Sequence, residues 1–257
     1  RMTAKIDAAP LAIGRISVSS AQVFGARLSL YKMTKDAPAN FQFVLDSLAS
    51  TDTTSQTPLD LRINSFIMRH SSVSYDQWDA VKTPEVFNPQ HVMVSGISAH
   101  IILKALREDS LNINVKRLTF LEQSGFNVHR LAFRLTANNK KAELQSFRLQ
   151  LPNTDLRIDS IQATYDLRDI KESLCLKGSI DNSHAAPADF RGLLPALKFY
   201  QGKVALSTRF EYEDKTLSVP SLQLLSDRDD LTLQANGRIK RPKYGKDVWN
   251  LNVTSLN

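Results

Sequence analysis

The residues with the clearest potential for chemistry are five histidines and one cysteine. No two of these histidines have the spacing of the helical H-E-x-x-H zinc motif. A lone cysteine can form neither an internal disulfide nor a cysteine-based zinc site. We therefore expect no metal site, no cofactor and no catalytic site. The six residues are His70, His91, His100, His129, His184 and Cys175.

Glycine-rich and nucleophile motifs are also absent from the sequence. It contains no G-x-S-x-G, P-loop or G-x-G-x-x-G stretch. Ser124 precedes a glycine, but "LEQSGF" has the composition of a turn and lacks the nucleophile-elbow pattern. One alternative stays open, which is an enzyme acting on an anionic polymer or glycan. Its histidine and carboxylates would have to come together from distant segments.

Apolar residues on every second position dominate the segments that would have to position any site. In "SGFNVHRLAFRL", a Ser-Gly turn precedes Leu131, Phe133 and Leu135, with Ala132 and Arg134 between them. This period of two predicts a β-strand with one apolar face. Similar stretches recur along the chain, separated by turn signals such as "PNTD" and "YEDK". Short connections favour antiparallel neighbours, so we expect a mainly β protein built as a long antiparallel meander.

The strand pattern is interrupted in two ways. The parity of the apolar positions changes at 115–118 and at 158–161, which predicts bulges or short turns there. The stretch "PADFRGLLPALKF" has helical spacing instead and predicts one short helix near 188–199. The break before this helix divides the chain into candidate segments 1–182 and 183–257. A single domain over the whole chain is the alternative.

The charge of the chain is basic but dispersed. The net charge is +7, and the isoelectric point is about 9.5. Such a balance indicates contact with anions, for example nucleic acid or lipid head groups. Lys and Arg stand singly between apolar residues, as in "LRIN", "VKRL" and "FRLQL". This distribution argues against a dedicated nucleic-acid site, so we expect no nucleic-acid partner.

The sequence contains no membrane-spanning helix of the usual kind. No stretch approaches the roughly 18 consecutive apolar residues that such a helix needs. The first residues, "RMTAKIDAAP", lack the architecture of a signal peptide and do not begin with Met. We expect a fragment or a processed chain, with any anchor lying outside it.

Three stretches carry a resemblance to a known family. In each of them, strands of the L-x-L type follow one another through short turns. They are "LDLRINSFIMRHSSVSYD", "LNINVKRLTFLEQSGFNVHRLAFRLTANNKKAELQSFRLQLPNTDLRID" and "DFRGLLPALKFYQGKVALSTRFEYEDKTLSVPSLQLLSDRDDLTLQANGRIK". The chain resembles the translocation and assembly module (TamB) family, within the AsmA-like group of bridge-like lipid carriers.

The resemblance implies an elongated sheet folded over into a half-pipe, or β-taco, with an apolar groove. It also implies a periplasmic segment tethered to the inner membrane by an N-terminal anchor outside this sequence. The groove would carry phospholipid or another acyl-chain lipid between the two membranes, or support outer-membrane protein assembly. A barrel protein of the outer membrane would then bind another part of the parent chain. The family offers no catalytic residues to transfer.

An apolar groove of this kind would be lined by the alternating apolar residues of the strands. An acyl chain gains about 0.8 kcal/mol for each CH₂ removed from water, so a continuous apolar face can shelter lipid while head groups stay wet. The candidate lining residues are Leu111, Ile113, Val115, Leu131, Phe133, Leu135, Phe147, Leu149, Leu151, Leu156, Ile158, Val204, Leu206, Leu231 and Leu233.

A closed β-sandwich is the alternative to the groove. In a sandwich the apolar faces would meet each other, and the chain would be a structural or protein-interaction module with no lipid groove. The same alternating pattern predicts both arrangements. The sequence therefore leaves open whether the apolar surface is a groove or a closed core.

Overall fold

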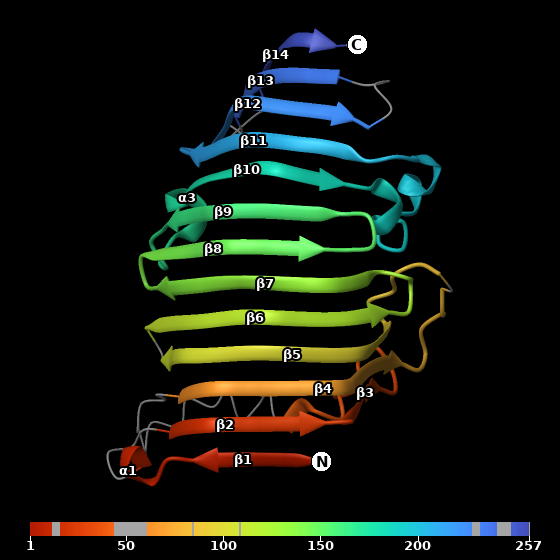
Figure 1. The fold of residues 1–257 in the computed structure, drawn as a ribbon, viewed down its shortest axis with the longest axis vertical. Helices are drawn as coiled ribbons and strands as arrows, with labels where there is room; N and C mark the ends of the chain where they lie inside the picture. Colours follow the sequence, from red (N-terminus) through yellow and green to blue (C-terminus); the bar gives the residue numbers. More distant parts are fainter. Residues whose placement is uncertain are drawn as a thin grey trace.

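The fold is described from a computed structural model of the 257-residue chain. The structure describes residues 1–11, 16–43, 61–83, 85–107, 109–227, 232–240 and 248–256. Over these residues the chain forms one open sheet of 14 strands (Figure 1). The predicted mainly β class is confirmed.

The strands range from five to 17 residues in length, and the helical elements between them are short. The strands are β1 (Met2–Ile6), β2 (Ile16–Phe24), β3 (Arg27–Lys32), β4 (Leu61–Gln77), β5 (His91–Arg107), β6 (Ser110–Glu122), β7 (Asn127–Asn138), β8 (Lys141–Gln150), β9 (Asp155–Thr164), β10 (Cys175–Ala185), β11 (Val204–Glu213), β12 (Thr216–Ser226), β13 (Thr232–Lys240) and β14 (Val248–Leu256). The helical elements are α1 (Ala8–Leu11), α3 (Ile170–Ser173), and the 3₁₀ helices η1 (Pro187–Phe190) and η2 (Pro195–Phe199).

Strand order in the sheet follows the order of the sequence almost throughout. From β4 to β14 each strand pairs antiparallel with the next one, as the short turns predict (Figure 1). The meander is not antiparallel everywhere, because β2 and β3 both pair parallel with β4. A parallel pair needs a long crossover connection, and the chain between β3 and β4 is long enough to provide one.

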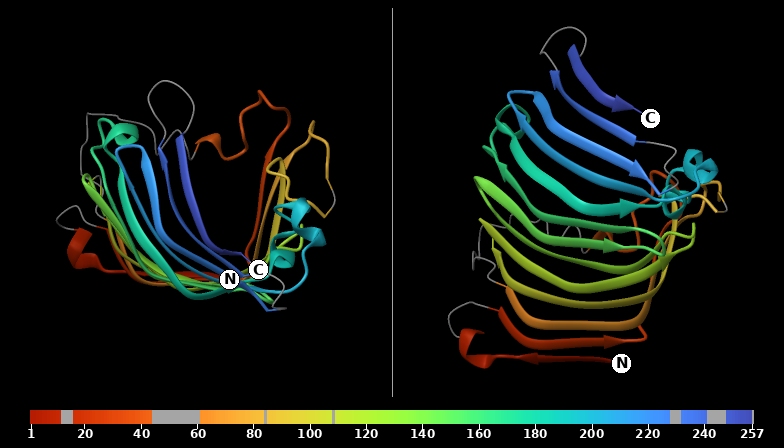
Figure 2. Two further views of the ribbon diagram at one scale, coloured as in Figure 1. Left: turned by 90° about the horizontal axis from the view of Figure 1, so that it is seen from above. Right: turned by 45° about the horizontal axis from the view of Figure 1, so that its top comes forward.

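The strands bend near their middle, so that the sheet folds over into the shape of a U (Figure 2). The ladder between β6 and β7 shifts register between Val115 and Leu118, which confirms the bulge predicted there. Strands near the bend also contain residues with positive φ, including His70, Gly96 and Ser146. An extra residue in a ladder bends the strand, so the bulges determine where along their length the strands bend. We call the line that joins these bends the fold line.

The sheet remains a single layer. Apart from the pairs η1–η2 and α1–β2, every sizeable contact between described elements joins neighbours in the sheet. No large side chain of the described residues is fully buried. The chain exposes 17290 Å², where a compact monomer of 28.8 kDa exposes about 11,000 Å². These observations exclude a second layer packed over the apolar face in the described part of the chain.

The predicted helix near 188–199 is two separate 3₁₀ helices, η1 and η2. Each begins at a proline, Pro187 and Pro195. Proline has no backbone N–H and is tolerated only in the first helical turn, so Pro195 ends one helical segment and begins the next. The predicted boundary between residues 182 and 183 falls inside β10, which pairs with β9 and β11 without leaving the sheet.

Candidate functional site

One face of the sheet is apolar across eleven strands. Directly opposite residues of neighbouring strands point to the same face, so the pairing register traces rows of side chains. The first row contains no charged residue and no side-chain amide. From β4 to β14 it consists of Leu61, Leu106, Leu111, Ala137, Ala142, Ala163, Leu176, Tyr212, Leu217, Ile239 and Trp249.

Further rows on the same face are equally free of charge. The second row is Ile6, Val18, Ile63, Leu103, Ile113, Leu135, Leu144, Ile161, Gly178 and Phe210. The third begins with Ala4, Ala21, Phe66, Ile101, Val115 and Phe133. The fourth begins with Met2, Val23, Met68, Ala99, Leu118, Leu131, Leu149 and Leu156. We call these rows together the apolar face.

The opposite face of the same strands is polar. One row on it runs beside the first apolar row and consists of Asn112, Thr136, Glu143, Gln162, Lys177, Glu211, Ser218, Arg238 and Asn250. The two faces therefore differ as the alternation in the sequence predicts.

The apolar face is the concave one. In β7, Leu131, Phe133 and Leu135 are half-buried, while Arg134 and Thr136 are exposed. In a single bent layer, side chains on the inner face converge and shelter one another, whereas those on the outer face splay apart. Because no second layer formed by the described residues covers either face, this difference in burial places the apolar residues inside the U of Figure 2.

The structure brings every described candidate lining residue except Leu151 to this apolar face. Phe147 pairs with Ile158, and Leu206 pairs with Leu224, which pairs with Leu233. Val204 opens β11 opposite Ala185.

Two candidates differ from the others. Leu151 is buried in the β8–β9 turn, where its N–H donates to the Thr154 carbonyl, so it does not line the open face. Leu231 lies outside the described residues.

Sequence reasoning missed the small members of the rows and the contribution of β4 and β5. Ala137, Ala142 and Ala163 are adjacent in the first row, which narrows the side-chain layer there. The third row gains Phe66 from β4 and Ile101 from β5. Alanine is weakly apolar and occurs on both faces of strands, so only the register identifies these alanines as members of the apolar face.

Several connecting loops lie side by side at one end of the strands. Segment 186–194, between β10 and η2, contacts the other loops, and we call it the rim segment (Figure 1). The Phe190 ring lies 6.1 Å from that of Phe126. The backbone N–H of Phe87 donates to the Gly192 carbonyl over 2.7 Å. The backbone N–H of Asn153 donates to the Asp189 carboxylate over 2.8 Å.

A buried carboxylate lies beneath the rim segment. Glu122 ends β6 and is 4% exposed. Its Oε2 accepts hydrogen bonds from the backbone N–H and the hydroxyl of Ser124, while Oε1 has no partner among the described residues. Gly192 lies against Ser124 so closely that a Cβ at Gly192 would approach the Ser124 hydroxyl oxygen to 2.7 Å.

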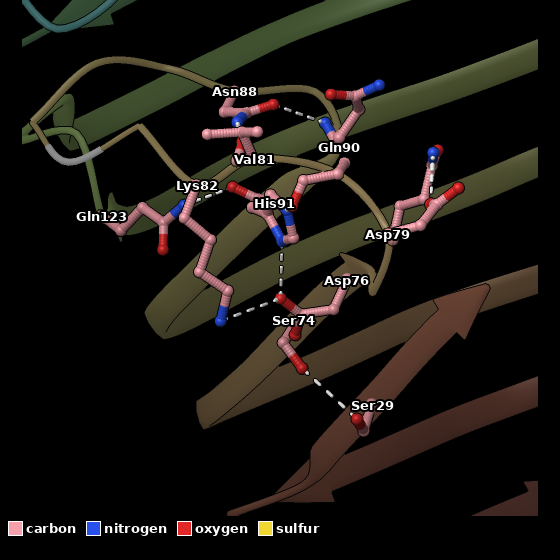
Figure 3. A network of polar contacts seen from close by, with 12 residues as sticks. Ser29, Ser74, Asp76, Asp79, Val81, Lys82, Asn88, Gln90, His91 and Gln123 are labelled. Carbon is pink, nitrogen blue, oxygen red and sulfur yellow. Dashed lines mark hydrogen bonds and ion pairs between the residues drawn. The ribbon is translucent and has the colours of Figure 1, made fainter. Parts of the chain in front are cut away.

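His91 anchors the loop between β4 and β5 at the same edge (Figure 3). Its side chain is 5% exposed. Nδ1 lies 3.0 Å from the Asp76 carboxylate, and Nε2 lies 2.9 Å from the Ala80 carbonyl oxygen. Asn88 extends the network by donating to the Val81 carbonyl over 2.9 Å. Both ring nitrogens already face an oxygen, so this histidine–carboxylate pair holds a loop in place and presents no free nitrogen to a nucleophile.

The convex face carries one compact ion cluster. Arg148 binds both carboxylate oxygens of Asp155, at 3.1 and 2.9 Å, and Arg157 donates to the same carboxylate over 2.7 Å. Hydrogen bonds from Arg157 and Arg148 hold the pKa of the Asp155 carboxyl well below its usual range. The cluster joins β8 to β9 next to their turn and is structural in character.

Known proteins offer no direct guide to the function. Neither the family models, nor the curated proteins, nor the solved structures contain a match to this chain. Among the described residues, no helix combines the length and the apolar character needed to cross a membrane. The same residues place no group of three or more His, Cys, Asp or Glu side chains around a common point that could hold a metal ion.

Proposed function

We propose that this chain is a lipid-sheltering segment of a TamB or AsmA-like bridge, whose concave apolar face holds the acyl chains of phospholipid or a similar lipid. The observation that carries the proposal is the set of uncharged rows that cross the sheet, over which the described part of the chain places no second layer. An exposed apolar area of this extent in a soluble protein marks a binding surface.

The dimensions and chemistry of the apolar face fit an acyl ligand. Neighbouring strands are about 4.8 Å apart, so the eleven strands from β4 to β14 extend the face over about 50 Å. Each CH₂ that leaves water on binding contributes about 0.8 kcal/mol without any directional contact. A head group would remain in solvent at the open side of the U, where it needs no specific polar site.

The rows continue to the edge strand of the sheet. Trp249 and Leu251 on β14 are each 67% exposed although they stand in line with the apolar face. That the groove is part of a longer bridge is proposed from the resemblance to the TamB family. An inner-membrane anchor, a periplasmic location and an outer-membrane barrel partner are proposed as properties of the parent protein. The chain acts as a conduit or scaffold and not as an enzyme.

A structural or protein-interaction module built as a closed β-sandwich is the less favoured function. It requires the apolar face to be covered by another part of the chain, and the described residues form no such layer.

Lipid content of the purified protein tests the proposal. Native mass spectrometry and lipid extraction should find phospholipid bound to the chain. Leu135→Glu places a charge on the apolar face and should remove most of it. The matched control is Thr136→Glu, which introduces the same charge one residue further along β7 on the convex face. Absence of lipid from the unaltered chain, or equal loss in both variants, would contradict the proposal.

A further inference from the structure

A hollow lies at the bend of the sheet, and two of its lining residues, Met68 and Ala99, belong to the fourth row of the apolar face. Residues of β4, β5 and β6 line it, and they include Arg69, His70, Ser98, His100, Arg117 and Thr119. A second hollow adjoins it. The second hollow shares Arg117 and Thr119 with the first and adds His129 from β7.

The pairing register explains why these polar side chains meet. His100 lies directly opposite Arg117, and Ser98 directly opposite Thr119, so all four point to the convex face. His70 has a φ of 51°, and nearby Gly96 has a φ of 62°. These left-handed residues bend β4 and β5 away from regular pairing and open the hollow at the fold line.

The charges around the hollow are of one sign. Among the residues that the structure describes, no Asp or Glu lines either hollow. In the described part of the chain, neither Arg69 nor Arg117 forms an ion pair. Two other arginines of the convex face, Arg148 and Arg157, instead share the carboxylate of Asp155. Cations gathered without a counter-charge repel one another, and a bound anion removes that repulsion.

We propose that this hollow is a binding site for a phosphate group. Arg69 and Arg117 would supply guanidinium donors, which match phosphate oxygens in pairs. His100 and His70 would add ring N–H donors, and the hydroxyl of Ser98 can donate as well. The side chains of Ser98, His100, Arg117 and Thr119 point to the face opposite the proposed lipid surface, and the site does not depend on lipid binding there. The phosphate can belong to a soluble anion or to a lipid head group, which share this chemistry.

Two probes distinguish these sources. Isothermal titration with inorganic phosphate measures the soluble anion. Cosedimentation with phosphatidylglycerol vesicles, compared with phosphatidylcholine vesicles, measures an anionic membrane surface. The test variant combines Arg117→Gln with His100→Gln. The matched control is Arg134→Gln, which removes an exposed arginine from the convex face of β7 outside both hollows. Thermal melting verifies that both variants fold.

We expect the double variant to bind at least one probe about tenfold more weakly than the unaltered chain, because two charge-assisted donors are lost. The Arg134→Gln control should bind like the unaltered chain. Loss confined to inorganic phosphate assigns a soluble anion, and loss confined to anionic vesicles assigns a head group. Either result supports the site. Failure of the unaltered chain to bind either probe, or equal weakening in the double variant and the control, would overturn it.

Discussion

The ring of Phe210 on β11 lies over Gly178 on β10. A Cβ added at Gly178 would lie 2.7 Å from Cζ of Phe210 and 3.0 Å from Cγ1 of Ile161 on β9. The aromatic ring thus occupies the space that a side chain at position 178 would take, and it reaches across β10 to the next member of the row. A glycine in the second apolar row is therefore not a gap in the apolar face, because its neighbour covers it.

This relationship gives a test in which the effect of one substitution changes sign. Gly178→Ala in the unaltered chain should lower the free energy of unfolding by about 1 kcal/mol, because the ring must move aside. In a Phe210→Ala background only Cγ1 of Ile161 remains close to the new Cβ, at 3.0 Å, and this side chain can shift by a few tenths of an ångström. The same substitution should then raise that free energy by about 0.5 kcal/mol by restricting the unfolded chain. Urea unfolding of the four proteins measures the coupling. Additive effects would show that the ring does not fill this space.

Charges on the apolar face should affect lipid more than stability. Phe133→Glu and Leu149→Arg each place a charge at a half-buried position that faces open space. We expect each to lower the free energy of unfolding by about 1–2 kcal/mol, less than an unpaired charge costs in a closed core, because solvent still reaches the site. Bound lipid should fall sharply in both. Thermal melts compared with lipid extraction check this, and complete unfolding of both variants would favour a closed core instead.

The Asp155 cluster should make stability dependent on acid. The folded-state pKa of Asp155 lies below its unfolded value of about 3.9, so the unfolded chain binds the proton first as pH falls. The contribution of this carboxylate is complete above about pH 5 and decreases as pH falls through 4 and below. Asp155→Asn should cost about 1–3 kcal/mol at pH 7 and flatten this part of the profile. Asp159→Asn removes an exposed carboxylate of β9 outside the cluster, and this control should change the free energy of unfolding at pH 7 by less than about 0.5 kcal/mol. Unfolding of the unaltered chain and of both variants, measured from pH 7 to pH 3, tests whether the Asp155 cluster makes stability depend on pH.

The rim segment should be sensitive to a single methyl group. In Gly192→Ala the new Cβ would meet backbone and side-chain oxygens of Ser124, which is itself held by buried Glu122. Because backbone cannot move aside as a flexible side chain can, we expect a loss of about 1–3 kcal/mol. Hydrogen exchange should rise in the rim segment and in the loops that it contacts. Leu193→Ala, at a neighbouring exposed residue, should leave exchange as it is. Equal exchange in the two variants would contradict the contact with Ser124.

The alternation of apolar residues was sufficient to predict strands, their apolar face and the bulge at 115–118. Those features depend on local backbone geometry, in which side chains alternate and one extra residue reverses the faces. The same alternation could not predict that the apolar face has no second layer over it in the described part of the chain. Leu131, Phe133 and Leu135 would alternate identically if another layer covered them, and whether a layer exists depends on where the chain goes next.

The unpredicted parts of the site depend on register and on proline chemistry. His100 and Arg117 are 17 residues apart in the sequence, and only the β5–β6 ladder places them opposite each other. Asp155 meets Arg148 for a similar reason, across the β8–β9 turn. The helical spacing at 188–199 was misleading because Pro195 interrupts hydrogen bonding inside the segment.

Site-specific photocrosslinking tests most directly whether the concave face holds acyl chains. A photoreactive amino acid would be placed at Leu135 on the apolar face or at Thr136 on the convex face of the same strand. After irradiation in the presence of phospholipid, mass spectrometry would detect lipid attached to the chain. We expect lipid adducts at position 135 and few or none at position 136. No adduct at 135, or adducts of equal yield at both positions, would contradict a lipid-holding concave face.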